Sequence, residues 1–128
     1  MQLPPLLSER PPALQIVLAN VVPLVFGGIC GLLLGISEPA YLVLSVLAIG
    51  GGYFAGLEHP TAREGAVRGT IGGMQFGAMI LLVHELTGKE AKVHLPDPAI
   101  LLVVLTTVLG IALGYLGGRS RAKRSARR

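Results

Sequence analysis

The spacing of charged residues most constrains what this chain can fold into, because they fall in clusters separated by long uncharged runs. Runs without Asp, Glu, Lys or Arg cover residues 11–37, 39–57, 69–84 and 98–118, which are 27, 19, 16 and 21 residues long. A helix needs about 20 apolar residues to cross roughly 30 Å of hydrocarbon. Barrel strands would alternate in character at every second residue, and these runs do not. The pattern predicts an all-α integral membrane protein with four transmembrane helices.

Composition points the same way. The 128 residues are 52% hydrophobic and 14% charged, with a mean hydropathy of +0.66. A soluble domain of this size carries about a quarter charged residues, since a small body has much surface to wet. A disordered chain needs low hydrophobicity and high charge. The composition therefore excludes both a soluble domain and a disordered chain.

Local signals place the helix ends. Glu38 and Asp97 each precede a proline, which predicts an acidic N-cap with proline at the first helical position. Thr61 and Glu64 fit a capping box. Gly117-Gly118 is expected to close the last helix. The predicted organisation is a cytoplasmic segment 1–12, a four-helix domain 13–118 with helices near 13–36, 39–57, 64–86 and 98–118, and a basic tail 119–128.

Lysine and arginine predict the orientation. If both termini lie inside, nine basic residues are cytoplasmic and only Lys89 and Lys92 are outside, a strong positive-inside bias. The size, the basic tail and the lack of large loops suggest a prokaryotic inner-membrane protein. The inner set is Arg10, Arg63, Arg68, Arg119, Arg121, Lys123, Arg124, Arg127 and Arg128.

An internal repeat relates the second and fourth helices. Residues 46–56 and 108–118 are identical at six of eleven positions at a constant offset of 62. We interpret this as two similar helical hairpins inserted in the same orientation, which an axis along the membrane normal would relate. Convergent low-complexity membrane sequence is the alternative.

Glycines recur at every fourth residue on each predicted helix, which lets two backbones approach closely in lipid. The pattern predicts glycine-zipper packing and a homo-oligomer. The four-glycine face of the third helix is expected to be the contact between protomers or hairpins, and burial of all the faces inside a monomer is the alternative. The glycines are Gly27, Gly31, Gly35, Gly52, Gly56, Gly65, Gly69, Gly73, Gly77, Gly110, Gly114 and Gly118.

Uncharged polar residues fall near the middle of three helices. Pro23 has no N–H and is expected to leave the Ala19 carbonyl without a donor, beside Asn20. Two readings stay open for these residues: lining of a small pore or substrate site, or interhelical hydrogen bonds. The candidates are Asn20, Gln75, Thr106 and Thr107.

The third helix has an uncharged run of 16 residues, which spans about 24 Å and is short for a bilayer. Either Arg68 extends into the hydrocarbon from the cytoplasmic side, or His84 and Glu85 extend into it from the outer side. In the second case the two residues would modulate the outer entrance of a pore. Location of both residues at the headgroup level is the alternative. In the inner loop 57–64, balanced charge favours ion pairing that fixes the junction of the two hairpins.

The sequence supports neither catalysis nor a metal or cofactor site. His59 is predicted inside but His84 and His94 outside, and no nucleotide-binding loop is present. Partners are expected to be the bilayer, anionic lipid headgroups and possible further membrane subunits, with no nucleic acid. The residues predicted to touch headgroups are Arg119, Arg121, Lys123, Arg124, Arg127 and Arg128.

These features favour a non-enzymatic function as a small oligomeric channel or transporter for a small solute or ion. A non-transporting structural or assembly subunit of a larger membrane complex is the alternative, and a holin-like lesion former is a third. The residues name no solute.

Overall fold

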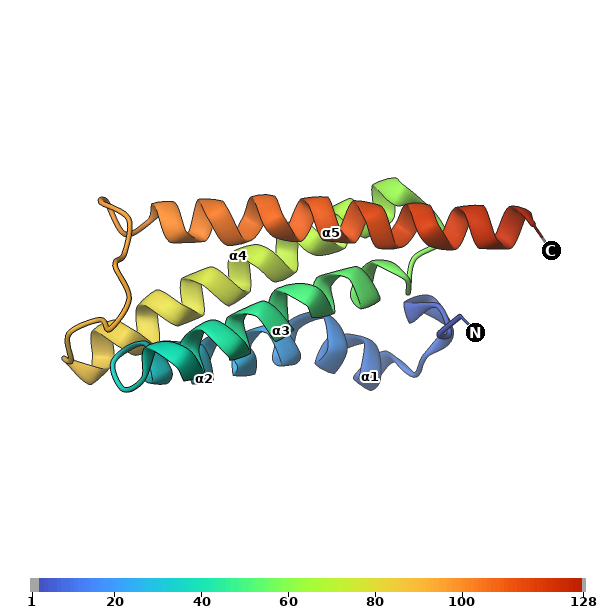
Figure 1. The fold of residues 1–128 in the computed structure, drawn as a ribbon. Helices are drawn as coiled ribbons and strands as arrows, with labels where there is room; N and C mark the ends of the chain where they lie inside the picture. Colours follow the sequence, from blue (N-terminus) through green and yellow to red (C-terminus); the bar gives the residue numbers. More distant parts are fainter. Residues whose placement is uncertain (1–2, 128) are drawn as a thin grey trace.

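The computed structural model describes residues 3–127, which fold entirely into helices and connecting turns (Figure 1). Four helical stretches are long and apolar enough to cross a membrane: Pro12–Leu34, Glu38–Gly56, Ala62–Thr87 and Leu101–Ala126. The first stretch is one continuous run of helix made of three parts, α1, a π-helical turn and α2. In chain order the elements are a 3-10 helix Leu7–Glu9, α1 Pro12–Ile16, a π-helical turn Val17–Val21, α2 Val22–Leu34, α3 Glu38–Gly56, α4 Ala62–Thr87 and α5 Leu101–Ala126.

Side-chain caps begin two of these helices. Thr61 is the N-cap of α4 as predicted, because its Oγ1 accepts from the Glu64 N–H at 3.2 Å. The N-cap of α3 is Ser37, whose Oγ accepts from the Ala40 N–H at 3.3 Å. The predicted cap at Glu38 is therefore wrong by one residue, and Glu38 lies in the first helical turn.

The last helix differs most from its predicted range of 98–118. It begins at Leu101, after a turn in which the Pro98 carbonyl accepts from the Leu101 N–H, so Asp97 does not cap it. At its other end it continues through Gly117-Gly118 to Ala126. Both glycines are buried against neighbouring backbone, so they provide close packing there and do not stop the helix.

The helices form an elongated bundle in which α4 packs on α5 and on α2, and α5 packs on α3. Figure 1 shows both termini at one end of the bundle, with the long α4–α5 connection at the other. We call these the terminal end and the far end. The loop 57–61 between α3 and α4 also lies at the terminal end.

Glycines set the separation of α4 and α5. A methyl group on Gly69 would overlap the carbonyl of Gly110, and one on Gly110 would overlap the carbonyl of Gly69. Gly65 and Gly114 face each other in the same way. The predicted role of the four-glycine face as a contact between protomers or hairpins is therefore wrong: α5, the other half of the same hairpin, covers it.

The other tight contacts also use glycine. A Cβ on Gly27 or Gly31 of α2 would lie 2.6 Å from a backbone oxygen of α4, that of Phe76 or Ile80. Gly56 of α3 meets the backbone of α5 at Gly114. By contrast, Gly50 of α3 has no neighbouring atom within 4 Å. Close backbone approach gives these helices dispersion contacts that lipid cannot replace.

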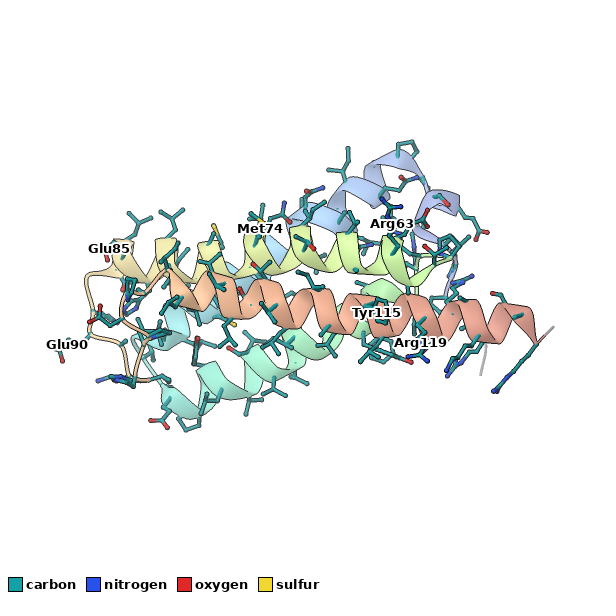
Figure 2. The ribbon with its side chains drawn as sticks, turned by 90° about the horizontal axis from the view of Figure 1, so that it is seen from above. Arg63, Met74, Glu85, Glu90, Tyr115 and Arg119 are labelled. Carbon is teal, nitrogen blue, oxygen red and sulfur yellow. The ribbon has the colours of Figure 1, made fainter. Side chains whose placement is uncertain are left out.

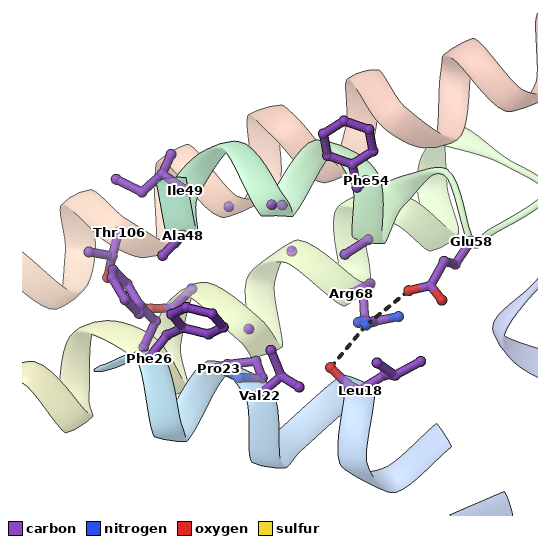
Figure 3. A pocket seen from close by; sticks show the side chains of 18 of the residues that line it. Leu18, Val22, Pro23, Phe26, Ala48, Ile49, Phe54, Glu58, Arg68 and Thr106 are labelled. Atoms are coloured by element: carbon purple, nitrogen blue, oxygen red, sulfur yellow. Dashed lines mark hydrogen bonds and ion pairs between the residues drawn. The ribbon is translucent and has the colours of Figure 1, made fainter. Parts of the chain in front are cut away.

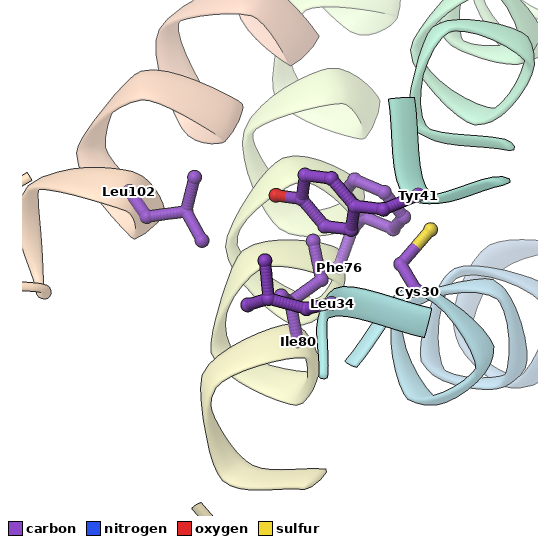
Figure 4. Packing of buried hydrophobic residues seen from close by; sticks show 6 residues of the cluster. All are labelled: Cys30, Leu34, Tyr41, Phe76, Ile80 and Leu102. Carbon is purple, nitrogen blue, oxygen red and sulfur yellow. The ribbon is translucent and has the colours of Figure 1, made fainter. Parts of the chain in front are cut away.

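A hydrophobic cluster fills the far half of the bundle (Figure 4). Its members come from all four long helices, and Cys30 and Leu34 have no exposed surface. Large apolar side chains also cover the outside, and Figure 2 shows Met74 and Tyr115 on outer faces. An apolar exterior around buried polar groups suits lipid as the solvent. The cluster consists of Cys30, Leu34, Tyr41, Phe76, Ile80 and Leu102.

The glycine contacts predict a sharp difference between two alanine substitutions. Gly69→Ala should cost at least about 1–3 kcal/mol of stability, because the added methyl overlaps backbone that cannot rotate away. Gly50→Ala should be neutral or stabilising by up to about 1 kcal/mol, because alanine favours helix and the site is open. Thermal unfolding in detergent micelles, followed by circular dichroism, measures both. Equal stability of the two variants would contradict the packing described here.

Candidate functional site

A buried ion cluster lies at the terminal end of the bundle. Glu58, in the loop after α3, has Oε1 at 3.3 Å from Nη2 of Arg68 and Oε2 at 2.9 Å from Nη2 of Arg10. The side chains of Glu58 and Arg68 are each only 9% exposed. The Leu7 N–H also donates to the Glu58 carbonyl at 2.8 Å. Glu58 of the inner loop is ion-paired as predicted, but its partners lie outside residues 57–64, and they tie the N-terminal segment and α4 to that loop.

Arg68 also binds the backbone of the first helix, where its Nη2 donates to the Leu18 carbonyl at 3.1 Å (Figure 3). In the π-helical turn the Val22 N–H donates to the carbonyl of Val17. The next bond of this kind would join the N–H of residue 23 to the carbonyl of Leu18, but Pro23 has no N–H, so this carbonyl is available. The sequence had pointed to Ala19 because it assumed α-helical register, and the π turn moves the available carbonyl by one residue.

His59 completes the surroundings of Arg68. Its Nε2 lies 3.3 Å from Nη1 of Arg68, and because a guanidinium can only donate, this nitrogen accepts. Burial and the neighbouring Arg68 cation lower the pKa of His59 below its usual 6.5, against the opposing effects of Glu64 and Glu58. The imidazole is therefore neutral at neutral pH, which keeps this acceptor available.

A cavity of about 440 Å³ extends from the ion cluster into the bundle, between the four long helices (Figure 3). Arg10, Glu58 and Arg68 line its terminal end. Phe76 and Thr106 line it farther along the bundle. Phe76 also belongs to the hydrophobic cluster that fills the far half. The cavity is therefore blind, with charge at one end and packed apolar side chains at the other. Its walls include Leu18, Val22, Pro23, Phe26, Leu47, Ala48, Ile49, Phe54 and Ala55.

Two of the predicted pore residues bond to each other away from this cavity. Nε2 of Gln75 donates to Oδ1 of Asn20 at 2.8 Å, joining α4 to the first helix. Nδ2 of Asn20 lies 3.4 Å from the Ile16 carbonyl. Neither side chain lines the cavity. For this pair, the structure has the second of the two readings, an interhelical hydrogen bond.

The two threonines use their hydroxyls within the protein. Thr106 is buried and lines the cavity, and its Oγ1 donates to the Gly73 carbonyl at 2.8 Å. Thr107 donates to the Val103 carbonyl of its own helix at 2.6 Å. Thr106 is thus the one predicted pore residue that reaches the cavity described here, and its hydroxyl stabilises the α4–α5 contact.

His84 and Glu85 lie at the far end of the bundle, remote from the cavity. Glu85 is exposed, and Figure 2 shows it near the end of α4, next to the α4–α5 connection. His84 is half-buried, and its Nδ1 has no partner among the described residues. Arg68, near the other end of the same helix, is buried within the protein. The depth of Arg68, His84 and Glu85 in the bilayer stays a prediction.

The basic tail divides into two groups. Arg121 is turned toward the protein, where its Nη1 donates to the carbonyls of Leu57, at 2.7 Å, and Pro4. Its predicted role at lipid headgroups is therefore wrong, because α5 continues far enough to bring it over the loop after α3. Arg119, Lys123, Arg124 and Arg127 are exposed, and Arg128 lies outside the described residues.

The sequence did not reveal the cavity, nor that Arg10 would line it and that Arg121 would bind the loop after α3. The balanced charge of the inner loop was the available signal for Glu58, but nothing in the spacing showed which arginines would reach it. Within residues 3–127, no group of three or more His, Cys, Asp or Glu side chains is placed to hold a metal ion.

The ion cluster predicts that removal of its single carboxylate is costly. Glu58→Gln leaves Arg10 and Arg68 without their counter-ion and should lower stability by about 3–5 kcal/mol, the range for breaking a buried pair. Glu64→Gln, at an exposed site in the first turn of α4, is the matched control and should change stability by less than about 0.5 kcal/mol. Thermal unfolding in micelles compares them, and similar values for both would show that the cluster contributes nothing.

No protein-family model, curated protein or solved structure matches this chain. The shape and charge of the cavity are therefore the observations that bear on its function.

Proposed function

We propose that this chain is a small inner-membrane transporter that accepts a small anionic solute in the cavity beside Arg68. The observation that carries the proposal is the excess of positive charge at the cavity's terminal end. Arg10 and Arg68 contribute two positive charges and Glu58 one negative charge, which leaves one positive charge in excess. Ionisable groups at membrane depth are expensive and are usually functional where they occur.

A transporter suits the cavity better than an open channel does. The far half of the bundle is filled by the cluster around Leu34 and Ile80, so no path crosses it in this state. A cavity that does not run through the whole bundle suits alternating access, in which a central site is reached from one side at a time. Asn20 and Gln75, which a polar pore would need, hydrogen-bond to each other instead.

We further propose that the terminal end faces the cytoplasm. The described basic residues of the N-terminal segment, the first two turns of α4 and the C-terminal part of α5 gather there, whereas Lys89 and Lys92 follow α4 at the far end. The positive-inside rule favours the more basic end as the cytoplasmic one. A solute would then enter the cavity from the cytoplasm or its lipid leaflet.

The glycine contacts support a glycine zipper within the α4–α5 hairpin, and we keep the two-hairpin repeat as a proposal. Under the offset of 62, Gly52 corresponds to Gly114. Gly114 meets the backbone of Gly65, whereas Gly52 meets only the Leu113 Cβ at 3.6 Å. The second hairpin would then be the rigid copy, and the first the looser copy that can move during transport.

A homo-oligomer also remains a proposal. Since most glycine faces are covered inside the chain, its contact would use the large apolar side chains on the outside of the bundle.

A cavity-filling substitution tests the transport proposal. In proteoliposomes, the wild-type protein should take up radiolabelled benzenesulfonate, a small permanently charged anion, faster than protein-free liposomes. Ala48→Trp fills the cavity and should reduce uptake to the protein-free rate. Ala112→Trp, on an exposed position of α5 outside the cavity, should leave uptake unchanged.

Uptake at the protein-free rate by all three proteins would contradict transport of small anions. It would favour the alternative of a non-transporting subunit of a larger membrane complex. Equal inhibition by both substitutions would show that uptake does not depend on the cavity.

A further inference from the structure

We infer that the cavity binds an amphipathic anion, a single alkyl chain with a phosphate-like head group, that enters sideways from the lipid between α2 and α3. The inference rests on the proposed function, since it names the substrate class for the same cavity. It adds a route of entry and a requirement for an apolar tail, neither of which a small water-soluble anion would need.

The side opening is indicated by three side chains that line the cavity and are also exposed on the outside of the bundle. Phe26 of α2 and Leu47 and Phe54 of α3 line the cavity, yet they are also 37%, 65% and 58% exposed. A side chain that both lines a cavity and is exposed marks the edge of an opening. These exposed apolar edges belong to α2 and α3, so the opening lies between these two helices and faces the lipid.

The other sides of the cavity are closed by backbone packing. α4 and α5 approach at Gly69 and Gly110 so closely that no side chain fits between them. α2 is held to α4 by Gly27, against the carbonyl of Phe76. α3 meets the α5 backbone at Gly56. A ligand from the membrane would therefore enter between α2 and α3.

The charged end of the cavity suits an anionic head group. Arg10 and Arg68 share the Glu58 carboxylate, so the cluster carries an excess positive charge. Nε of Arg10 is buried and has no hydrogen-bond partner among the described residues, and Arg10 lines the cavity. A guanidinium donates readily to phosphate oxygens, so this Nε can bind the head group of a phosphate-like ligand.

The rest of the lining suits an alkyl chain. Beyond the ion cluster the walls are aliphatic, aromatic or glycine, and the hydroxyl of Thr106 is already used on the Gly73 carbonyl. The volume of about 440 Å³ lies within the usual range of about 300–1,000 Å³ for small-molecule sites. A bare inorganic anion would leave these apolar walls without contacts, whereas an alkyl chain would cover them.

Fluorescence quenching tests this inference, because the chain has no tryptophan. Phe26→Trp places a single reporter at the opening, and Leu105→Trp places one on the exposed face of α5, beside Thr106 and outside the cavity. Both variants are studied in nanodiscs of zwitterionic lipid and titrated with dodecyl phosphate brominated at the end of its chain. The Phe26→Trp variant should show saturable quenching, and the Leu105→Trp variant only a weak linear decrease.

Two further titrations identify what is recognised. Terminally brominated dodecanol, which has no charge, should give only the linear decrease in the Phe26→Trp variant. Excess inorganic phosphate should not reverse quenching by the brominated dodecyl phosphate. Saturable quenching by the alcohol, reversal by inorganic phosphate, or the same response from both tryptophan variants would each overturn the inference.

A charge substitution then tests the head-group end. In the Phe26→Trp background, Arg10→Gln should weaken binding by about tenfold or more, as the loss of a charge-assisted hydrogen bond implies. Arg63→Gln, at an exposed position of the same end, should leave binding unchanged. Equal effects of the two would exclude Arg10 from the site.

The outcomes separate this inference from the proposed function. Saturable binding without benzenesulfonate uptake would support the amphipathic ligand and contradict transport of small anions. Uptake of benzenesulfonate without saturable quenching would support transport and overturn the amphipathic ligand.

Discussion

The carboxylate of Glu58 is the constraint on which the terminal half of this structure depends. A buried guanidinium is costly in a bundle surrounded by lipid, and Arg68 is tolerable there because Glu58 and the Leu18 carbonyl accept its hydrogens. Glu58 in turn holds Arg10, which brings the N-terminal segment over the end of the bundle. Arg121 adds a second tie by donating to the Leu57 carbonyl. These contacts join segments from both ends of the sequence around one cavity.

The packing of the glycine helices and the presence of the cavity have a common origin. At Gly69 and Gly110 the α4 and α5 backbones meet directly, so this side of the bundle is thin and rigid. This contact brings α4 and α5 together, but it does not fill the space between α2 and α3. The space that remains there is lined by Phe26 and Phe54, and a bilayer offers it alkyl chains. Close packing on one side thus leaves an opening on the other.

Much of the fold was predictable from charge spacing alone, because lipid imposes length and composition on any segment that crosses it. The site was less predictable. The continuation of α5 past Gly117 depends on backbone from α3, which no local signal reports. The freed Leu18 carbonyl depends on a π turn, and the Asn20–Gln75 bond depends on the rotation of two helices. Such features follow from three-dimensional packing, and neighbouring residues in the sequence do not encode them.

The most direct test of the account is the accessibility of a thiol inside the cavity. Cys30 is buried, so in a Cys30→Ala background Ala48→Cys places the only thiol in the cavity wall, and Val46→Cys places one on the lipid-facing side of α3. A membrane-impermeant maleimide reacts with thiols that water reaches. We predict labelling of the Ala48→Cys protein in inside-out vesicles, none in right-side-out vesicles, and none of the Val46→Cys protein in either. Labelling of the Ala48→Cys protein from the outer side alone, or from neither side, would contradict a cavity that water reaches from the cytoplasmic half of the membrane.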